Sequence, residues 1–301
     1  MQSDNRTTIY LSICVAIVLW GFSFIWTNQL LIFEIPIFTF ITARMVLAGV
    51  IMLAVSSISG KLQKIAIKEF PIFLLMALFE PFIYFIGESF GMKYTNSPTI
   101  SSVIIATIPI FTLVSGQIFF KEKVSGLNIA AILMTIPGIL LMVVRQGEFG
   151  IDYWYGILIL FIAVFGAVGY TTIVRKLTEK YNSYTIATWQ FLLAAIYFLP
   201  TYFIFDIDKI PLQRLLHSDT LIPIICLAVL CSCLAFVLFI NSIRHLGITR
   251  ASVFTAMIPA VSALGAYIAG HESFTTMQII GIVVVINGVI FAQYQKPLRL
   301  N

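Results

Sequence analysis

Charged side chains are scarce in this sequence. Asp, Glu, Lys and Arg make up 10% of its 301 residues, whereas 60% are apolar and 14% aromatic. A soluble domain of this length would need much more charge on its surface, so the composition excludes a soluble globular chain. The sequence therefore predicts an all-α integral membrane protein.

Side chains typical of enzymes and metalloproteins are also few. The three histidines lie between the apolar runs of the sequence, and the four cysteines lie within them without metal-ligand spacing. Free thiols inside a helical bundle usually serve as small packing side chains. No P-loop motif is present, which argues against direct coupling to ATP hydrolysis. We therefore expect no catalytic site, no metal and no cofactor.

Apolar runs long enough to cross a ~30 Å hydrocarbon layer as helices recur along the whole chain. There are ten of them, at residues 9–30, 35–55, 70–90, 98–120, 127–144, 155–174, 184–205, 221–240, 252–269 and 277–293. Pro81 and Pro109 lie inside the third and fourth runs and predict kinks there. The first run is not followed by a small-residue cleavage site, so we expect a retained helix rather than a signal peptide.

Lys and Arg are distributed unevenly between the two sets of alternate loops. The N-terminal segment and the loops on its side carry thirteen of them; the other side carries only Lys93, Arg145, Lys209 and Arg214, and Arg44 lies within a span. The positive-inside rule then predicts a multi-pass protein of the plasma (inner) membrane with both termini cytoplasmic. Because this pattern accounts for the net charge of +5, no nucleic-acid partner is expected.

The two halves of the chain resemble each other. Residues 97–140 align without gaps with residues 247–290, and the matches include Thr99 with Thr249, Pro109 with Pro259, Glu122 with Glu272 and Gly138 with Gly288. Each half holds five spans, and because five is odd, the second half must enter the membrane from the opposite side. We therefore predict two inverted five-helix repeats, residues 1–148 and 149–301, around a central cavity, as in secondary transporters.

Several segments together resemble a known family. They are "LWGFSF" in the first run, an arginine midway along the second, and "KEKVSG" and "PGILLMV" after the fourth, with an echo from residue 257 to 289. This pattern is similar to the EamA-type branch of the drug/metabolite transporter superfamily, over almost the whole chain. The resemblance implies a ten-helix carrier that exports amino acids or related metabolites. It places Trp20 and Ser23 in the first-helix motif, and Pro109, Glu122, Pro259 and Glu272 in the repeat signature.

A few ionisable residues fall inside the predicted spans. A charge at the middle of a span costs roughly 2.5–3.5 kcal/mol, so such residues usually face a wet cavity and are functional. On straight helices Arg44 and Glu80 are level with each other, which predicts that they pair at a substrate site or, alternatively, as a neutral pair that joins two helices. Glu88 lies about two helical turns from Glu80, and Tyr84 lies between them on the same helix face. Glu88 and Tyr84 are therefore expected to form the outer approach to the substrate site. The carboxyl group left without a cation is a candidate for proton coupling.

Other polar and aromatic residues complete the predicted substrate site. Trp20 is expected to line the cavity, and Ser23, Tyr170, Gln190 and Asn241 are polar candidates that hydrogen bonding between helices would explain equally well. Pro109 and Pro259 are expected to supply paired kinks and are candidate hinges. Glu122 and Glu272 follow helix ends, where capping or pairing with a loop is expected.

These features predict a secondary transporter that works by alternating access. Following the family resemblance, we expect it to export amino acids or related small amphipathic metabolites, driven by their own gradient or by protons. One alternative is a nucleotide-sugar or phosphate-ester antiporter, which would favour several cations in the cavity. Another is an intramembrane lipid-modifying enzyme, which would need a His, Asp or Cys cluster near one interface. The expected partners are a small solute, the lipid bilayer and protons, and the sequence is compatible with a monomer or a homodimer.

Overall fold

The computed structural model describes residues 2–122, 126–143, 151–209, 212–268, 270 and 275–293. Within these ranges the chain forms helices joined by short turns, and no strand occurs. The first half contains α1 (Gln2–Ile32), α2 (Ile37–Ile58), η1 (Ile67–Glu69), α3 (Phe70–Ala77), η2 (Leu78–Ile83), α4 (Tyr84–Thr95), α5 (Pro98–Ile105), α6 (Ile108–Phe120) and α7 (Gly126–Val143). The second half contains α8 (Ile151–Leu177), α9 (Ser183–Phe205), α10 (Leu212–Leu215), α11 (Ser218–Cys226), η3 (Leu227–Leu234), α12 (Ala235–Leu246), α13 (Ile248–Val253), η4 (Phe254–Met257), α14 (Ile258–Ile268) and α15 (Thr276–Gln293).

The apolar runs of the sequence became helices of membrane-crossing length. Within the described ranges, eight helical segments are long and apolar enough to span a membrane: Thr7–Ile32, Ile37–Ile58, Ile67–Thr95, Pro98–Phe120, Ile151–Leu177, Ser183–Phe205, Ser218–Leu246 and Ile248–Ile268. The fifth and tenth predicted runs coincide with α7 and α15, which have 18 residues each. The structure therefore confirms an all-helical protein with multiple membrane spans.

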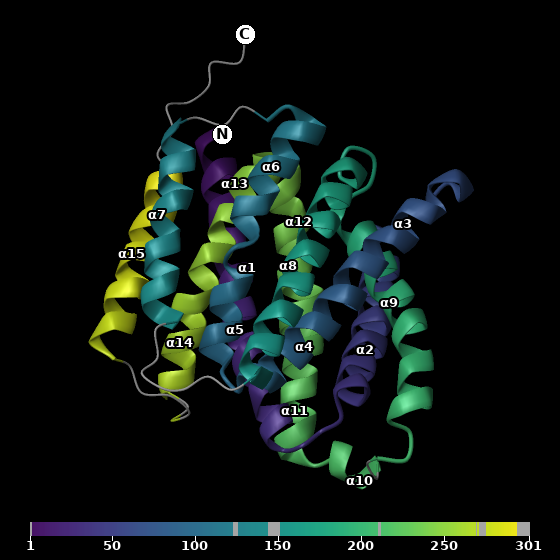
Figure 1. The fold of residues 1–301 in the computed structure, drawn as a ribbon. Coiled ribbons are helices and arrows are strands. Elements are labelled where there is room, and N and C mark those ends of the chain that lie inside the picture. Colours follow the sequence, from purple (N-terminus) through teal and green to yellow (C-terminus); the bar gives the residue numbers. More distant parts are fainter. Residues whose placement is uncertain are drawn as a thin grey trace.

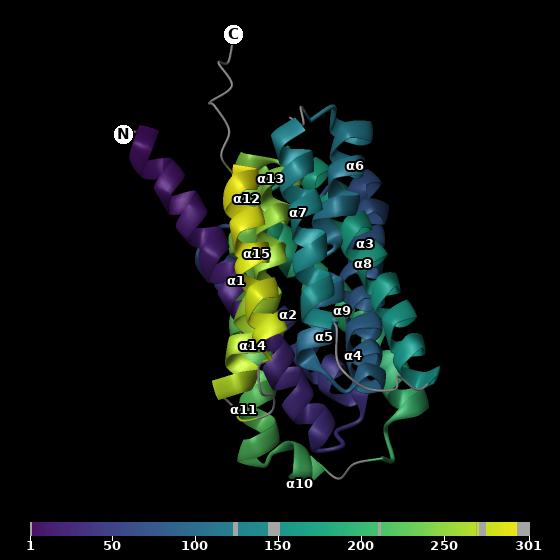
Figure 2. The same ribbon diagram turned by 60° about the vertical axis from the view of Figure 1, so that its left-hand side comes forward.

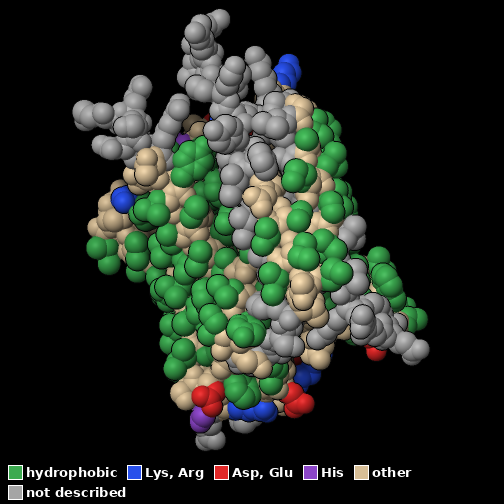
Figure 3. Space-filling model, turned by 90° about the vertical axis from the view of Figure 1, so that its left-hand side faces the viewer, with side chains coloured by type: hydrophobic (Ala, Val, Ile, Leu, Met, Phe, Trp, Pro, Cys, Tyr) green, Lys and Arg blue, Asp and Glu red, His purple; other side chains and the backbone are tan. Residues whose placement is uncertain are grey.

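The helices run roughly along one direction and form a single bundle (Figure 1). The start of α1 and the end of α15 lie at the same end, which we call the terminal end, and α10 lies at the opposite end, the α10 end (Figures 1 and 2). α7 packs against α15, α2 against α9, α4 against α8, and α1 against α12 and α14. Hydrophobic side chains occupy much of the middle of the face drawn in Figure 3, and charged side chains gather at its lower end. This pattern suits a surface in contact with lipid tails.

In four of the ten predicted spans, counted along the chain, the regular α-helix is interrupted part-way along. In the third, η2 is a π-helical segment in which Glu80 has an extended backbone (φ −147°, ψ 119°) and the Glu80–Pro81 peptide is cis. In the eighth, η3 is likewise π-helical. The fourth breaks between α5 and α6, and the ninth at η4, so that Pro109 and Pro259 each stand second in the helix that follows. Proline is tolerated in a first helical turn because its missing N–H has no partner there. The regular α-helix is thus broken just before both prolines, while the predicted hinge role stays a prediction.

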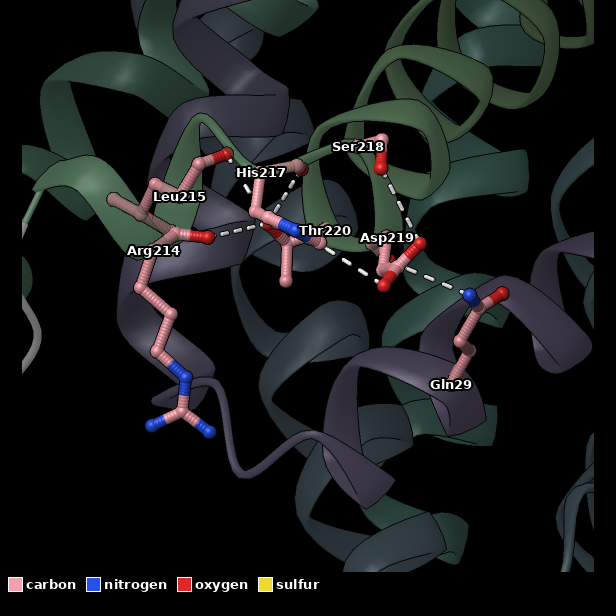
Figure 4. Close-up of polar contacts among 7 residues, drawn as sticks. All are labelled: Gln29, Arg214, Leu215, His217, Ser218, Asp219 and Thr220. Atoms are coloured by element: carbon pink, nitrogen blue, oxygen red, sulfur yellow. Dashed lines mark hydrogen bonds and ion pairs between the residues drawn. The ribbon is translucent and has the colours of Figure 1, made fainter.

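The α10 end is fastened by hydrogen bonds around the start of α11 (Figure 4). The Thr220 hydroxyl lies 2.6 Å from the Arg214 carbonyl oxygen and 3.0 Å from that of His217. The Gln29 amide of α1 donates to the Asp219 carbonyl oxygen at 3.3 Å, and the His217 imidazole lies 3.4 Å from the Asp219 carboxylate. These contacts hold the last turn of α1 against the α10–α11 turn.

α4 and α8 approach each other closely at glycine positions. A Cβ atom added at Gly87 would lie 2.9 Å from the Ala163 main-chain nitrogen, and one at Gly91 would lie 2.5 Å from the Leu160 Cγ. Small residues four apart permit such contacts between membrane helices. We expect Gly87→Ala to push the helices apart and destabilise the protein by about 1–3 kcal/mol. Thermal unfolding of purified protein would measure this, with Gly126→Ala as the control because a Cβ there meets nothing within 4 Å; equal midpoints for both variants would contradict the prediction.

Candidate functional site

A small cavity lies where the interrupted spans meet. Its volume is about 30 Å³, which is room for roughly two water molecules. The lining comes from both halves of the chain: α1, α2, η2 and α4, the breaks of the fourth and ninth spans, α8 and α12. Six of the residues predicted for the substrate site contribute to it, namely Trp20, Ser23, Arg44, Glu80, Tyr84 and Glu88.

Arg44 is buried, at 3% exposure, and is held by two neighbours. Its Nε donates a hydrogen bond to the Ser232 hydroxyl at 2.9 Å, and its guanidinium carbon lies 4.0 Å from the centre of the Phe85 ring. Stacking on an aromatic ring suits the planar guanidinium group, and the hydrogen bond fixes its orientation. Arg44 is thereby presented to the cavity in a defined position.

The expected ion pair between Arg44 and Glu80 is not formed. Within the described part of the chain, the ion pairs join Lys180 to Glu69, Lys209 to Asp206 and His217 to Asp219. The prediction assumed a straight third span, whereas the backbone at Glu80 is extended, so the depth of its side chain could not be counted along a regular helix. Arg44 nevertheless interacts electrostatically with both Glu80 and Glu88 across the cavity.

The two glutamates of the cavity differ in their surroundings. Glu80 is 6% exposed, and its carboxylate has no hydrogen bond or ion pair to the described residues. Glu88 is 3% exposed and accepts a hydrogen bond from the Tyr84 hydroxyl at 3.3 Å, as their spacing of one helical turn predicts. Glu80 is therefore the cavity glutamate whose side chain has no hydrogen-bond partner among the described residues.

An aromatic wall forms one side of the cavity. The Trp20 ring lies 5.0 Å from that of Phe236 and 4.7 Å from that of Phe239, measured between centroids. Its indole N–H donates to the Cys231 carbonyl oxygen in η3 at 3.1 Å, and the Ser23 hydroxyl donates to the Trp20 carbonyl oxygen at 2.7 Å. Because the indole N–H of Trp20 is already hydrogen-bonded to the main chain, the rest of its ring presents an apolar surface.

The hydrogen bond of Trp20 links α1 to the π-helical segment of the eighth span. We expect Trp20→Phe to keep the ring packing but lose this bond, at a cost of about 1 kcal/mol in unfolding free energy. Unfolding of purified protein by increasing denaturant measures the loss. As a control, Trp154→Phe changes an exposed tryptophan of α8, at 57% exposure. A similar loss of unfolding free energy in both variants would show that the hydrogen bond from Trp20 to Cys231 does not contribute to stability.

Three predicted site residues do not reach the cavity. The Tyr170 hydroxyl donates to the Gln190 Oε1 at 2.9 Å, and both side chains are fully buried between α8 and α9. Asn241 lies on α12 beyond the cavity, and its carbonyl oxygen is 2.8 Å from the His245 imidazole Nδ1. The hydrogen bond between Tyr170 and Gln190 joins two helices, which was the alternative explanation for such groups.

Sequence reasoning missed several residues of the site. Ser232 holds Arg44, and Phe85, Phe236 and Phe239 surround the cavity. The sequence does not distinguish the phenylalanines that line the cavity, since similar phenylalanines occur throughout the spans. Ser232 did carry a signal, because it is a hydroxyl side chain in the middle of a predicted span, between two cysteines.

A contact between the two halves of the chain lies at the terminal end. The Glu122 carboxylate, just after α6, accepts hydrogen bonds from the main-chain nitrogens of Ile248 at 3.0 Å and Thr249 at 3.1 Å. Glu122 therefore caps the start of α13, which confirms the predicted capping role and connects the two halves. Two glycines make room, because a Cβ at Gly116 would lie 2.5 Å from the Thr249 hydroxyl oxygen and one at Gly247 would lie 2.5 Å from Glu122 Oε1. Glu272, its counterpart in the repeat, is outside the described residues.

A wider hollow lies at the α10 end. It has a volume of about 680 Å³ between the ends of α1, α2, α4 and α9, and its lining includes Phe38, Phe90, Lys93, Asp206 and Lys209. The Asp206 carboxylate accepts the Thr39 N–H at 3.0 Å and pairs with Lys209 at 3.1 Å. The bundle is thus hollowed at this end and joined by Glu122 at the other.

Interrupted apolar spans around buried charges are characteristic of membrane transporters. The sequence model of the EamA-like transporter family matches residues 7–144 and again residues 154–294. The chain therefore belongs to the EamA-like transporter family, and its general function is transport.

Similar proteins agree with this assignment. An uncharacterized transporter of Archaeoglobus fulgidus is 26% identical over 282 residues, which cover 93% of this chain and 96% of the relative. The uncharacterized transporter YetK of Bacillus subtilis is 21% identical, over 95% of this chain and 87% of its own length. A solved crystal structure matches with a TM-score of 0.77 at 16% identity, over 95% of this chain and 98% of that one, which supports the fold.

Proposed function

We propose that the protein is a secondary transporter that exports amino acids or related small amphipathic metabolites by alternating access. The observation that carries the proposal is the buried cavity in which one arginine and two glutamates face one another beside an aromatic wall. Arg44 would bind the carboxylate of a solute, and Glu80 would bind its ammonium group. The rings of Trp20 and Phe239 would contact its apolar part. Arg44 is the only cation among the described lining residues, which favours amino acids over phosphate esters.

The proposed architecture is ten helices in two inverted repeats. The packing of the helices supports it, because contacts recur between the corresponding helices of the other half. If α1 corresponds to α8, α4 to α12 and α6 to α14, then the contact of α4 with α8 matches that of α12 with α1, and the contact of α6 with α8 matches that of α14 with α1. α5 contacts α14 as α13 contacts α6. Inverted repeats of this kind allow each half to adopt the conformation of the other, which exposes the site to the two sides in turn.

The proposed cycle requires the cavity to open. At about 30 Å³ it is too small for an amino acid. Opening at the terminal end would separate Glu122 from the start of α13, and the breaks before Pro109 and Pro259 would serve as hinges. We place both termini in the cytoplasm and the protein in the plasma membrane, in keeping with the lysines and arginines in the loops of the terminal end. Glu80 would carry a proton when no solute occupies the site.

Reconstituted protein tests this function. Proteoliposomes loaded with a mixed pool of amino acids and metabolites are diluted into solute-free buffer, with and without a pH gradient across the membrane. We expect protein-dependent loss of a subset of amphipathic solutes, accelerated by a gradient that returns protons in exchange. Protein-free vesicles are the control. Identical contents in both vesicle types after prolonged incubation would refute transport of these solutes.

A further inference from the structure

An extended segment joins α2 to η1 at the terminal end. Residues 61–66, which we call the basic strap, are hydrogen-bonded to the turn between α8 and α9 and to the first turn of α9. The Gln63 N–H donates to the Thr185 hydroxyl at 2.9 Å, and that hydroxyl lies 3.2 Å from the Lys61 carbonyl oxygen. The Ala66 N–H donates to the Tyr181 hydroxyl at 3.3 Å. These bonds hold the strap in one place, so the surface that it forms is preorganised.

A groove is lined by residues of the strap, η1, α3 and α9. Helices α3 and α9 pack against each other (Figure 1). The volume of the groove is about 730 Å³, and the residues that line it are Lys64, Ile65, Ile67, Phe70, Pro71 and Trp189. The Phe70 and Trp189 rings meet edge to face at 6.0 Å. Trp189 lies six residues into α9, or about 9 Å from the helix start. The groove therefore runs from the end of the bundle down its apolar side.

The charges around the groove favour an anion at its mouth. Lys64 is the one charged residue of its described lining. The nearby Glu69 carboxylate is already bound by the Lys180 ammonium and the Tyr181 hydroxyl, so it does not oppose an anion. Ile67, in the lining, is 92% exposed, and Ile58, which precedes the strap, is 89% exposed. Lysines beside exposed aliphatic side chains at the end of a span are suited to the headgroup layer of a membrane.

We propose that this groove binds an anionic phospholipid, with the phosphate at Lys64 and an acyl chain against Phe70 and Trp189. A soluble anion would leave the apolar floor uncovered. A zwitterionic lipid would find no carboxylate in the groove for its cationic group. The site is separate from the substrate cavity, with which it shares no lining residue.

Quenching of tryptophan fluorescence tests the lipid site directly. Protein is reconstituted with brominated phosphatidylglycerol or brominated phosphatidylcholine, and the quenching that is absent in Trp189→Phe reports lipid in the groove. We expect phosphatidylglycerol to quench Trp189 with about fivefold higher relative affinity, the effect of one lysine near an anionic headgroup. Equal quenching by the two lipids would overturn the proposal.

Variants and competitors identify the contacts. Lys64→Gln should abolish the preference, whereas Lys93→Gln, an exposed lysine at the other end of the bundle, should preserve it. Glycerol phosphate should not displace the brominated lipid; displacement would assign the site to soluble phosphates instead. If neither lipid quenches Trp189 while the protein forms dimers that Trp189→Phe weakens, the groove is covered by a second copy of the chain and the proposal fails.

Discussion

Replacing Glu80 by glutamine is expected to reduce transport by at least tenfold in proteoliposomes. The substitution removes a buried carboxylate that faces the cavity and has no hydrogen bond or ion pair to the described residues. It preserves the shape of the side chain, so the folded structure should be maintained. A lost charge interaction with a bound ammonium group is worth about 1.5–3 kcal/mol, which corresponds to a tenfold to hundredfold effect. Initial efflux rates with and without a pH gradient measure it.

Two comparisons distinguish a site effect from misfolding. Glu179→Gln removes an exposed carboxylate in the turn after α8 and should leave transport unchanged. Arg44→Lys keeps the positive charge but loses the planar group that stacks on Phe85 and bonds to Ser232, so it should also impair transport. Full activity in both Glu80→Gln and Arg44→Lys would place the substrate elsewhere, even if the fold is correct.

Removing the carboxylate of Glu122 is expected to open the terminal end. Glu122→Ala deletes two charge-assisted hydrogen bonds to the start of α13. At about 1.5–3 kcal/mol for each bond, the equilibrium between closed and open conformations should shift by on the order of 100-fold or more. Ser252 on α13 is fully buried, so a cysteine at this position reports the opening. In a background without native cysteines, maleimide should label Ser252→Cys much faster when Glu122 is alanine.

The same labelling experiment provides its own controls. Glu122→Gln retains one acceptor oxygen and should give an intermediate rate. Glu179→Ala, which changes a carboxylate elsewhere at the surface, should not alter labelling. Transport by Glu122→Ala should fall, because the cycle would no longer pass efficiently through the closed conformation. A labelling rate indistinguishable from that of the parent would show that this cap does not govern opening.

The positions of the apolar helices could be predicted from the sequence because a membrane span needs a long run of apolar residues. Scarcity of charge also directed attention to Arg44, Glu80 and Glu88, which do line the cavity. Their contacts could not be predicted, because the extended backbone at Glu80 breaks the helical geometry on which the argument depended. Tyr170 and Gln190 illustrate another limit. A polar pair that joins two helices and a polar pair that binds a ligand have the same sequence pattern.

The role of Glu122 was predicted more fully. Its place after a helix end indicated a capping function, and its recurrence in both halves marked it as part of the repeat. The helix that it caps belongs to the other half of the chain, and no local pattern indicates such a partner. Long-range contacts of this kind follow from tertiary packing rather than from spacing.

The tight cavity also bears on the energy stored across the membrane. A continuous file of water through the bundle would let ions cross without cargo and would dissipate the membrane potential. The cavity has space for only about two waters beside its aromatic rings, so it would not by itself supply such a file. A membrane could then contain many copies of this protein without losing its electrical potential through them.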